Sequence, residues 1–395
     1  MKLTIRHLIR GVTFPALALV ALTGCMNRDA VPVTPHTMPK IGSIGERFLA
    51  YNVEMVEITG GRFWAPYING EPPKGSDRYE YREPIDLGNA RLRKLAAALG
   101  PSYVRFSGTW ANATYFAESD SAPAEAPAGF DTVLTRKQWR GAVEFASAVD
   151  AGIVTSMATS PGTRANNGVW QPGHAERLIN YTRTLGARIA AAEFANEPNM
   201  IELTQPPEDY SAADYRRDYA RFYQLVRRSS PETLILAPGS AELGEPMRTL
   251  ARWLSGMKTF DPVELLTSES PPPDVVSFHY YGASSQRCKL PLIGSKPADA
   301  FDAGKIAGID DGIRRTAELR DRIVPGAPLW NTESGETACG GNPWASTFAD
   351  TFRFLDQLAR SAQQGVQVFF HNTLARIHRL PDGQRAPDVP YPDRR

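Results

Sequence analysis

The chain has 395 residues, a formal net charge of +1, 42% hydrophobic residues and 22% charged residues. This is ordinary globular composition, and the length suffices for one large barrel or for two domains. Because the net charge is close to zero and the basic residues are scattered, nothing favours nucleic acid or an acidic membrane surface as a partner.

The first 25 residues have the pattern of an export signal. A basic stretch at residues 1–10 precedes a short apolar run, which ends in Leu22-Thr-Gly-Cys25. The run is too short for a comfortable membrane span, which favours a signal peptide. Leu-Thr-Gly-Cys resembles a bacterial lipobox, so we expect Cys25 to be lipidated and the protein to be an exported, membrane-anchored lipoprotein of a bacterial envelope. An ordinary signal peptide with an unrelated cysteine is the alternative. Residues 26–43 are then a flexible tether.

Eight apolar runs of strand type alternate with segments whose apolar residues recur at three and four positions, the helical period. This alternation predicts parallel strands joined by crossover helices, and eight repeats most simply close into an α/β fold, a (β/α)8 TIM barrel, over residues 44–375. An open doubly wound sheet is the rival, but no Gly-x-Gly-x-x-Gly follows the first strand and no Gly-rich phosphate loop is present. The expected strands are residues 48–56, 102–106, 152–157, 191–195, 233–237, 274–278, 327–332 and 365–370. The expected helices are residues 86–99, 136–150, 174–188, 209–229, 245–258, 309–323 and 344–363.

Two segments do not fit a complete barrel. Residues 61–85 are a Pro/Gly-rich excursion after the first strand, and loops of this length in compact domains are usually functional. Residues 376–395 contain four prolines and no helical period, so we expect a disordered or aberrant tail where the eighth helix should stand.

Export changes the expected state of the cysteines. With Cys25 assigned to lipid, Cys288 and Cys339 remain as an even pair in an oxidising compartment. Both follow predicted strands and therefore lie on the same rim of the barrel, where a disulfide between them is an open option.

Two of the predicted strands end at a glutamate. Asn196-Glu197-Pro198 follows the fourth strand, and its proline disfavours helix at Glu197; Glu333 follows the seventh strand. Both acids are therefore expected at the carboxyl-end rim, where barrel enzymes place their chemistry. One acid kept protonated and one kept ionised would form a retaining glycosidase pair, with carboxyl groups about 5–5.5 Å apart.

The sixth strand adds His279, Tyr280 and Tyr281, which can hydrogen-bond carboxylates and sugar hydroxyls. Such a pair of residue types is as often structural, but its place on the same rim as two glutamates favours the site. We expect no metal, because none of the six histidines has ligand spacing such as His-Glu-x-x-His, and the two-carboxylate mechanism needs no cofactor.

Several segments in order resemble glycoside hydrolase family 79, the heparanase and β-glucuronidase family of the clan A retaining glycosidases. The Asn-Glu-Pro segment is shared by many clan A families, whereas the ordered set, which spans most of residues 44–375, is more selective. The segments are residues 48–54, 103–109, 194–199, 279–281, 330–333 with Gly340-Gly341, and 367–370.

The resemblance implies Glu197 as acid/base and Glu333 as nucleophile. Glu336 is the alternative nucleophile, but Trp330, three residues before Glu333, favours Glu333. Asn196 would bind the hydroxyl next to the reacting carbon.

The resemblance also implies residues that bind the sugar. His279 and Tyr281 would line the site, with Tyr281 as the partner of the nucleophile. Glu54 stands where the family often has Asp, and would contact the sugar. The amides of Gly340 and Gly341 would receive a uronic carboxylate.

The sequence departs from the family after the barrel. No β-sandwich domain follows, and the tyrosine-containing segment expected after the eighth strand is replaced by Arg376-Ile-His-Arg379. We therefore expect apolar surface to be exposed on the barrel. The expected function is a β-glucuronidase-like retaining hydrolase acting on an oligo- or polysaccharide that contains uronic acid. A xylosidase- or glucosidase-type clan A enzyme and a truncated, non-catalytic glycan-binding lipoprotein are the alternatives.

Overall fold

The chain divides into two units, Met1–Ser43 and Ile44–Arg395. In the first unit the described part contains a 3-10 helix, Pro35–Thr37. The predicted signal peptide with Cys25, the predicted helix at 245–258 except for Lys258, and the predicted tail lie outside the described residues. The computed structural model describes residues 34–68, 70–72, 78–123, 125–242, 258–288 and 294–373.

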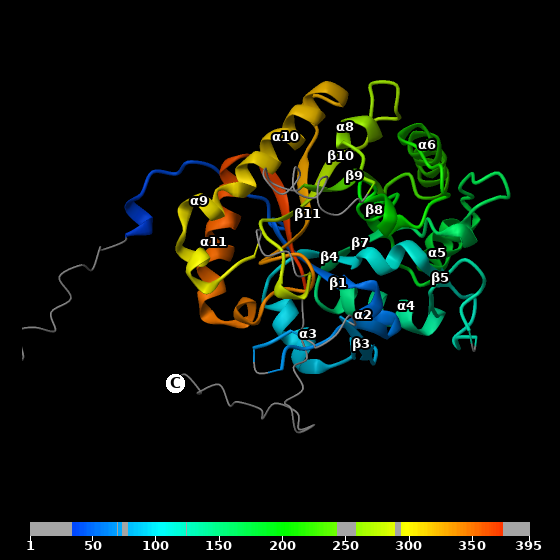
Figure 1. The fold of residues 1–395 in the computed structure, drawn as a ribbon, viewed down its shortest axis with the longest axis horizontal. Helices are drawn as coiled ribbons and strands as arrows, with labels where there is room; N and C mark the ends of the chain where they lie inside the picture. Colours follow the sequence, from blue (N-terminus) through cyan, green and yellow to red (C-terminus); the bar gives the residue numbers. More distant parts are fainter. Residues whose placement is uncertain are drawn as a thin grey trace, which may run out of the picture. The chain divides into compact units, whose positions relative to one another are not determined.

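Eight parallel strands of the second unit form a closed barrel, which confirms the predicted fold and excludes an open doubly wound sheet (Figure 1). Going around the barrel, the order is β1-β12-β11-β10-β9-β8-β7-β4, so the chain circles once and its last strand pairs with its first. The strands are β1 (Leu49–Glu54), β4 (Ser102–Ser107), β7 (Ala151–Ser156), β8 (Ile189–Glu193), β9 (Leu234–Glu242), β10 (Val275–Tyr281), β11 (Leu329–Gly335) and β12 (Val366–His371).

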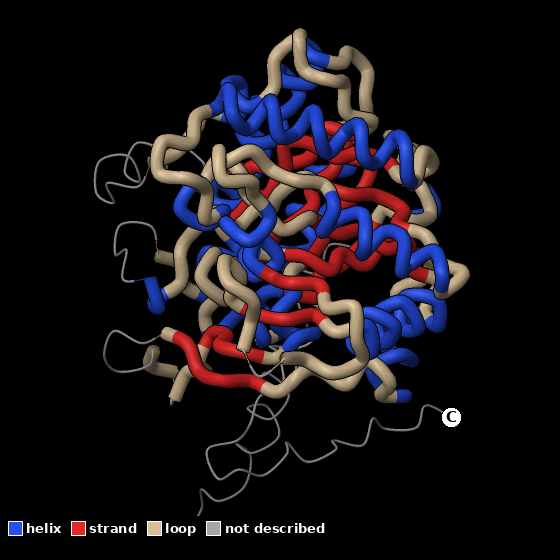
Figure 2. The backbone as a smooth tube through the Cα atoms, turned by 90° about the vertical axis from the view of Figure 1, so that its right-hand side faces the viewer, coloured by secondary structure: helices blue, strands red, loops and turns tan. Residues whose placement is uncertain are grey.

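Helices enclose the strands (Figure 2). Polar caps set several of their starts: Thr135 Oγ1 accepts the amide of Gln138 in one helix, and Ser211 Oγ accepts the amide of Asp214 in another. The helices are α2 (Met55–Thr59), α3 (Ala90–Ala97), α4 (Arg136–Ala148), α5 (Gly173–Thr184), α6 (Ala212–Ser229), α8 (Pro262–Leu265), α9 (Ala303–Ile306), α10 (Gly308–Ile323) and α11 (Phe348–Gln363). Among the described residues, none of the helices combines the length and apolar character that a membrane crossing requires.

A ring of apolar side chains fills the barrel interior below its mouth, the end at which the strands have their carboxyl ends. Because its members come from strands all around the closed sheet and pack together, they point inward. The side chains two residues further along several of these strands therefore also point inward, nearer the mouth. The ring contains Ala50, Val154, Ala191, Leu236, Val275, Trp330, Val368 and Phe370, with Tyr103 packed against it.

The segment after the first strand differs from the sequence prediction. β1 ends at Glu54, whose amide donates to the Glu57 carboxylate, and α2 takes up the two residues predicted as the end of the strand. The excursion at 61–85 is partly regular, because β2 (Gly61–Trp64) and β3 (Tyr79–Arg82) pair as an antiparallel hairpin. A second small sheet pairs β5 (Thr114–Phe116) with β6 (Thr132–Leu134) in the connection after β4.

The outer face of α11 exposes large apolar side chains. Phe348 is 78% exposed and Phe352 is 45% exposed, and the Phe352 ring packs on Phe301, which is itself 64% exposed. Apolar surface of this kind was expected from the sequence, and the exposed rings identify where it lies on the barrel.

Candidate active site

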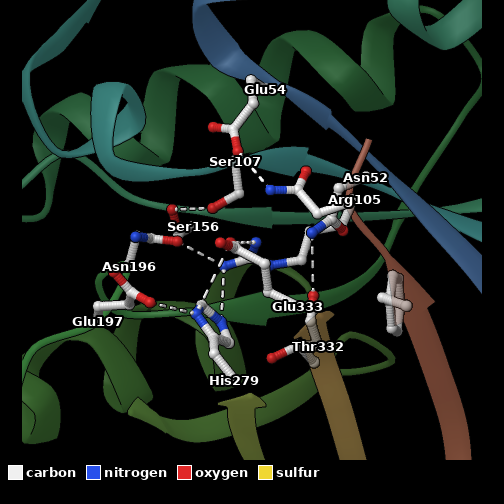
Figure 3. A network of polar contacts seen from close by, with 12 residues as sticks. Asn52, Glu54, Arg105, Ser107, Ser156, Asn196, Glu197, His279, Thr332 and Glu333 are labelled. Carbon is white, nitrogen blue, oxygen red and sulfur yellow. Dashed lines mark hydrogen bonds and ion pairs between the residues drawn. The ribbon is translucent and has the colours of Figure 1, made fainter. Parts of the chain in front are cut away.

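Strand alternation lines the mouth of the barrel with polar side chains. On β4, Arg105 follows the inward-facing Tyr103 by two residues; on β10, His279 follows Val275 by four. The same period places Glu54 beyond Ala50 on β1. The strands are parallel, so these positions meet at one end of the barrel. Figure 3 shows the resulting network.

Glu333 lies within β11, near its end, at an irregularity in the sheet. The register between β10 and β11 shifts so that Phe278 pairs with Asn331 and His279 with Glu333. Thr332 can therefore bond to a carboxylate inside the barrel while Glu333 also turns to the mouth, which is how a bulge re-aims a side chain.

Two donors hold the Glu333 carboxylate. Tyr281 donates its hydroxyl to Oε1 at 2.8 Å, and Arg105 Nη1 donates to Oε2 at 2.9 Å. Burial alone would raise the pKa of Glu333, but the nearby His279 and Arg105 and the two hydrogen bonds outweigh burial, and the pKa lies below its usual value. This carboxyl group is therefore ionised near neutral pH.

Glu197 lies on a turn four residues beyond the end of β8, rather than at the strand end itself. Its φ of 50° is left-handed, which is uncommon for a residue other than glycine and recurs at functional sites. The turn is pinned by Asn112, whose Oδ1 accepts the Asn196 amide and whose Nδ2 donates to the Asn196 carbonyl. The Glu197 side chain is 12% exposed, and its Oε1 lies 3.1 Å from His279 Nδ1.

His279 lies between the two glutamates. Its Nδ1 is 3.1 Å from Glu197 Oε1 and 3.7 Å from Glu333 Oε2. One oxygen of each carboxylate and one imidazole nitrogen lie within 4.8 Å of one another, a set that is also able to ligate a metal ion. The guanidinium of Arg105 already binds Glu333 and opposes a second positive charge there.

Arg105 lies at the centre of the network, and no role was predicted for it from the sequence. Its side chain is fully buried, and it donates through Nε and Nη2 to Glu193 Oε2 at 3.0 and 2.8 Å, and through Nη2 to Asn196 Oδ1 at 2.8 Å. Burial would lower the pKa of this guanidinium, but the charges of Glu193 and Glu333 raise it above its ordinary value. Arg105 thus connects a carboxylate inside the barrel with the one at the mouth.

A second group of polar side chains faces Glu333 from β1 and from the residue after β12. Asn372 Nδ2 donates to the hydroxyl of Tyr281 at 2.8 Å and to Glu54 Oε1 at 3.0 Å. Burial, then the charge of Glu333, raises the pKa of Glu54 well above its usual value, so Glu54 keeps its proton to higher pH than a free glutamate does. Glycine is required at Gly108, because a Cβ there would lie 1.5 Å from Glu54 Oε2.

Burial also raises the pKa of Tyr281, so its hydroxyl stays protonated and donates. Four polar atoms near this mouth are buried and have no hydrogen-bond partner among the described residues, so each has bonding capacity left over. They are Asn52 Oδ1, Glu54 Oε2, Asn196 Nδ2 and Asn372 Oδ1.

Gly340 and Gly341 lie in the loop after β11, outside the polar network. Both have positive φ, and a Cβ on Gly340 would lie 2.6 Å from the Trp64 ring. Glu336 folds into the same loop, where its carboxylate accepts from the amide and the side chain of Asn342. Cys288 and Cys339 form a disulfide that joins this loop to the one after β10.

The structure therefore brings together six of the residues that the sequence singled out and adds others. Glu54, Asn196, Glu197, His279, Tyr281 and Glu333 surround one mouth. Arg105 could have been identified from the sequence, because it is a charged residue in an otherwise apolar strand. Asn372 had none, because its contact with Glu54 spans 318 residues of sequence.

Known proteins with similar sequences are heparanases. No protein-family model matches the chain. Bovine (Bos taurus) heparanase is 23% identical over 350 residues, 77% of this chain and 61% of its own length. Mouse (Mus musculus) heparanase is 23% identical over 384 residues, 86% of this chain and 64% of its own length. The chain thus spans somewhat less than two thirds of these relatives.

The fold has solved counterparts as well. A 4-O-α-L-rhamnosyl-β-D-glucuronidase from Fusarium oxysporum superposes with a TM-score of 0.52 and 14% identity, covering 87% of this chain and 66% of that chain. At this identity the likeness concerns the barrel fold. The resemblance predicted from the ordered motifs is confirmed by the sequence relatives: the chain is similar in sequence to heparanases, and its TIM-barrel fold is similar to that of the solved Fusarium oxysporum protein.

Proposed function

We propose that the chain is a retaining glycoside hydrolase that cleaves β-linked glycans containing uronic acid, with Glu333 as nucleophile and Glu197 as acid/base. The observation that carries the proposal is the pair itself: two carboxylates on one barrel rim, on either side of His279, with oxygens within 4.8 Å of each other. Retaining enzymes hold their carboxyl groups about 5–5.5 Å apart and inverting enzymes about 6.5–9.5 Å apart, so the close approach of these two oxygens favours the retaining arrangement.

The surroundings of the two acids support this division of roles. Glu333 is ionised and held by Tyr281 and Arg105, as a nucleophile should be. Glu197 is the more exposed of the two and contacts an imidazole, so its carboxyl group is able to exchange protons with water.

In the first step an oxygen of Glu333 attacks the anomeric carbon while the bond to the leaving oxygen breaks. Glu197 gives its proton to that oxygen, and a glycosyl ester of Glu333 forms. In the second step Glu197 takes a proton from water, the water oxygen bonds to the anomeric carbon, and Glu333 is released as carboxylate. Asn196 Nδ2 and Glu54 are the groups that we assign to the sugar hydroxyls.

The uronic-acid preference draws support from the sequence relatives and from the loop of Gly340 and Gly341, whose family counterparts bind a uronic carboxylate. The name of the Fusarium oxysporum counterpart, a β-D-glucuronidase, agrees with this preference. Because the chain spans under two thirds of its heparanase relatives, activity itself is part of the proposal.

We further propose that the protein is exported and anchored by lipid at Cys25. The signal-like residues 1–25 support this, as does the Cys288–Cys339 disulfide, since disulfides persist in oxidising compartments. Mass spectrometry of the mature N-terminus tests the anchor: a lipid-modified Cys25 supports it, and an unmodified N-terminus at another residue contradicts it.

The test of function is hydrolysis of chromogenic β-glucuronide, β-glucoside and β-xyloside by residues 26–395. Turnover of the glucuronide that is lost in Glu333→Gln, with the β-anomer as first product by NMR, supports the whole proposal. Turnover of another sugar keeps the mechanism and replaces the substrate. No turnover from folded protein favours a non-catalytic glycan-binding role.

A further inference from the structure

His279 lies on β10 with its side chain fully buried, and its two ring nitrogens face groups of opposite kind. Nε2 lies 3.2 Å from Nη2 of Arg105. Nδ1 lies 3.1 Å from Oε1 of Glu197 and 3.7 Å from Oε2 of Glu333. A neutral imidazole carries its proton on one nitrogen and a lone pair on the other, and the hydrogen bonds of both nitrogens decide between the two tautomers. The neighbours of His279 therefore determine where its proton lies.

Both sides of the ring require the same tautomer. A guanidinium has only donors, so the Arg105 contact is a hydrogen bond only if Nε2 of His279 is the acceptor. On the other side, a lone pair on Nδ1 would face oxygens of two carboxyl groups, whereas an Nδ1–H donates to the nearer one (Figure 3). The neutral ring thus carries its proton on Nδ1 and donates a hydrogen bond to Oε1 of Glu197.

Arg105 is held in the position that this contact needs. Its Nε and Nη2 donate to Oε2 of Glu193, at 3.0 and 2.8 Å. The other oxygen of that carboxylate accepts from the hydroxyls of Ser277 at 3.2 Å and Thr332 at 2.9 Å. Glu193 is fully buried, and its bonds join β8 to β4, β10 and β11, so the guanidinium has a fixed orientation. The tautomer of His279 is therefore set by a buried ion pair below the mouth.

The tautomer decides which oxygen of Glu197 carries the acid proton. A protonated carboxyl group accepts hydrogen bonds chiefly at its carbonyl oxygen and donates from its hydroxyl. Because Oε1 accepts from the Nδ1–H of His279, Oε1 is the carbonyl oxygen and the proton lies on Oε2. The opposite tautomer would turn a lone pair toward Oε1 and draw the acid proton onto that oxygen, between the two side chains, where it would not meet a leaving group.

We propose that His279 is a positioning residue for the acid, which keeps the proton of Glu197 on Oε2. The buried pair of Arg105 and Glu193 holds the His279 proton on Nδ1, and His279 keeps that proton throughout the reaction. In the first step the acid proton passes from Oε2 to the leaving oxygen as the glycosidic bond breaks, and in the second step Oε2 takes a proton from the attacking water. This inference rests on the proposed role of Glu197 as acid/base, and it adds which oxygen acts and what selects it.

The first experiment measures the tautomer itself and needs no turnover. In protein labelled with nitrogen-15 histidine, at mildly alkaline pH, NMR distinguishes a protonated ring nitrogen from one with a lone pair. We expect His279 to show a protonated Nδ1 and an unprotonated Nε2, and its signals to be those that shift in Glu197→Gln. His174 is the internal reference, because its Nε2 accepts the Phe116 amide at 2.7 Å and its neutral ring therefore carries the proton on Nδ1 as well. Burial lowers the pKa of His174 to about 3, which keeps that ring neutral.

The second experiment separates the two ring nitrogens by substitution. The amide nitrogen of Asn lies as many bonds from Cα as Nδ1 does, and the amide of Gln lies as many as Nε2 does. His279→Gln therefore keeps an acceptor for Arg105 and loses the donor to Glu197, whereas His279→Asn keeps the donor. On methyl β-glucuronide, kcat should fall about 10-fold further in His279→Gln than in His279→Asn, the size of one lost hydrogen bond. On nitrophenyl β-glucuronide, whose leaving group departs without a proton, the two variants should be alike.

His174→Asn is the matched control, which should lower Tm and leave the ratio of the two rates unchanged. A protonated Nε2 on His279 overturns the inference and leaves the proposed function intact. Equal losses in folded His279→Gln and His279→Asn on methyl β-glucuronide, or a loss of the same kind in the control, overturn it too. Should both His279 variants fail to fold, the NMR spectrum of the parent decides. A parent that hydrolyses neither glucuronide overturns the proposed function, and the inference with it.

Discussion

The ends of β8 and β11 each present a glutamate to the same mouth, but they hold it in different ways. At the end of β11, Glu333 sits within the strand, and both of its oxygens accept bonds, from Tyr281 and Arg105. Beyond β8, Glu197 stands on a left-handed turn, where its side chain is more exposed and contacts His279.

The difference matches what the two proposed roles require. A nucleophile has to stay ionised and in line with the reacting carbon, and rigid donors on strands provide both. A general acid has to gain and lose a proton in every cycle, which a partly exposed carboxyl on a turn is able to do. Substitutions of the two acids and of the groups around Glu333 should therefore differ in their effects.

The largest expected effect is on kcat, and its dependence on the leaving group should differ between variants of the two acids. Glu333→Gln should lower kcat on the order of 10⁴-fold or more on every substrate, since it removes the proposed nucleophile. Glu197→Gln should cost about 10²–10⁴-fold on a natural glycoside but far less on an activated aryl glycoside, which leaves without a proton. Steady-state kinetics on both substrate types gives the answer, with Glu176→Gln on α5 as the control. Equal leaving-group dependence in the two variants would contradict the assignment.

Removing the buried charge below the mouth should have the next largest effect. Arg105→Leu leaves Glu193 and Glu333 without their cation, so the free energy of unfolding should fall by about 3–5 kcal/mol. Chemical denaturation measures this loss. Glu193→Gln in the same background should recover part of it, because one unpaired charge is removed. Strict additivity of the two variants would show that the ion pair is not what stabilises this layer.

Tyr281→Phe removes one of the two hydrogen bonds that hold the proposed nucleophile, Glu333, and should have a smaller effect. The lost hydrogen bond stabilises the ionised form of Glu333, so its removal raises the pKa of that carboxyl. The acid limb of the kcat/KM profile should move to higher pH, and kcat should fall about 10-fold. Tyr280→Phe is the control, since Tyr280 packs beside Gly308 and Gly312 on the other face of β10. An unmoved acid limb would assign that limb to a group other than Glu333.

Much of this fold could be predicted because its signals are local. Apolar runs that alternate with helical periodicity identified all eight barrel strands, and the parallel arrangement then placed Glu197, His279 and Glu333 on one rim. The predicted strand ends were less accurate where side chains compete with the hydrogen bonds between strands. β1 gives way to α2 at the Glu54 and Glu57 contact, and Glu197 falls on a turn because the strand before it ends four residues earlier.

The remainder depends on contacts that no local pattern encodes. The shift in register at Glu333 arises between two strands and cannot be read from either one. Asn372 meets Tyr281 and Glu54 only after the barrel closes β12 on β1. Arg105 was visible as a charge in an apolar strand, but its partner Glu193 is identified only by the three-dimensional structure.

The smallest expected effect concerns Glu54, the third acid at the mouth, and the pH dependence of the free energy of unfolding. Its pKa is raised in the folded protein, chiefly by burial and then by Glu333, so folding retains a proton that the unfolded chain releases above a pH of about 4.3. Stability therefore declines as pH rises from that value toward the folded pKa. Glu54→Gln needs no such proton, so its free energy of unfolding should exceed that of the parent by about 1 kcal/mol or more at pH 7 and by little at pH 4. Urea denaturation at both pH values measures the gap, with the exposed Glu46→Gln as control. A gap that is the same at both pH values would mean that Glu54 is ionised beside Glu333, and the mouth would then hold three carboxylates in place of one neutral acid and a working pair.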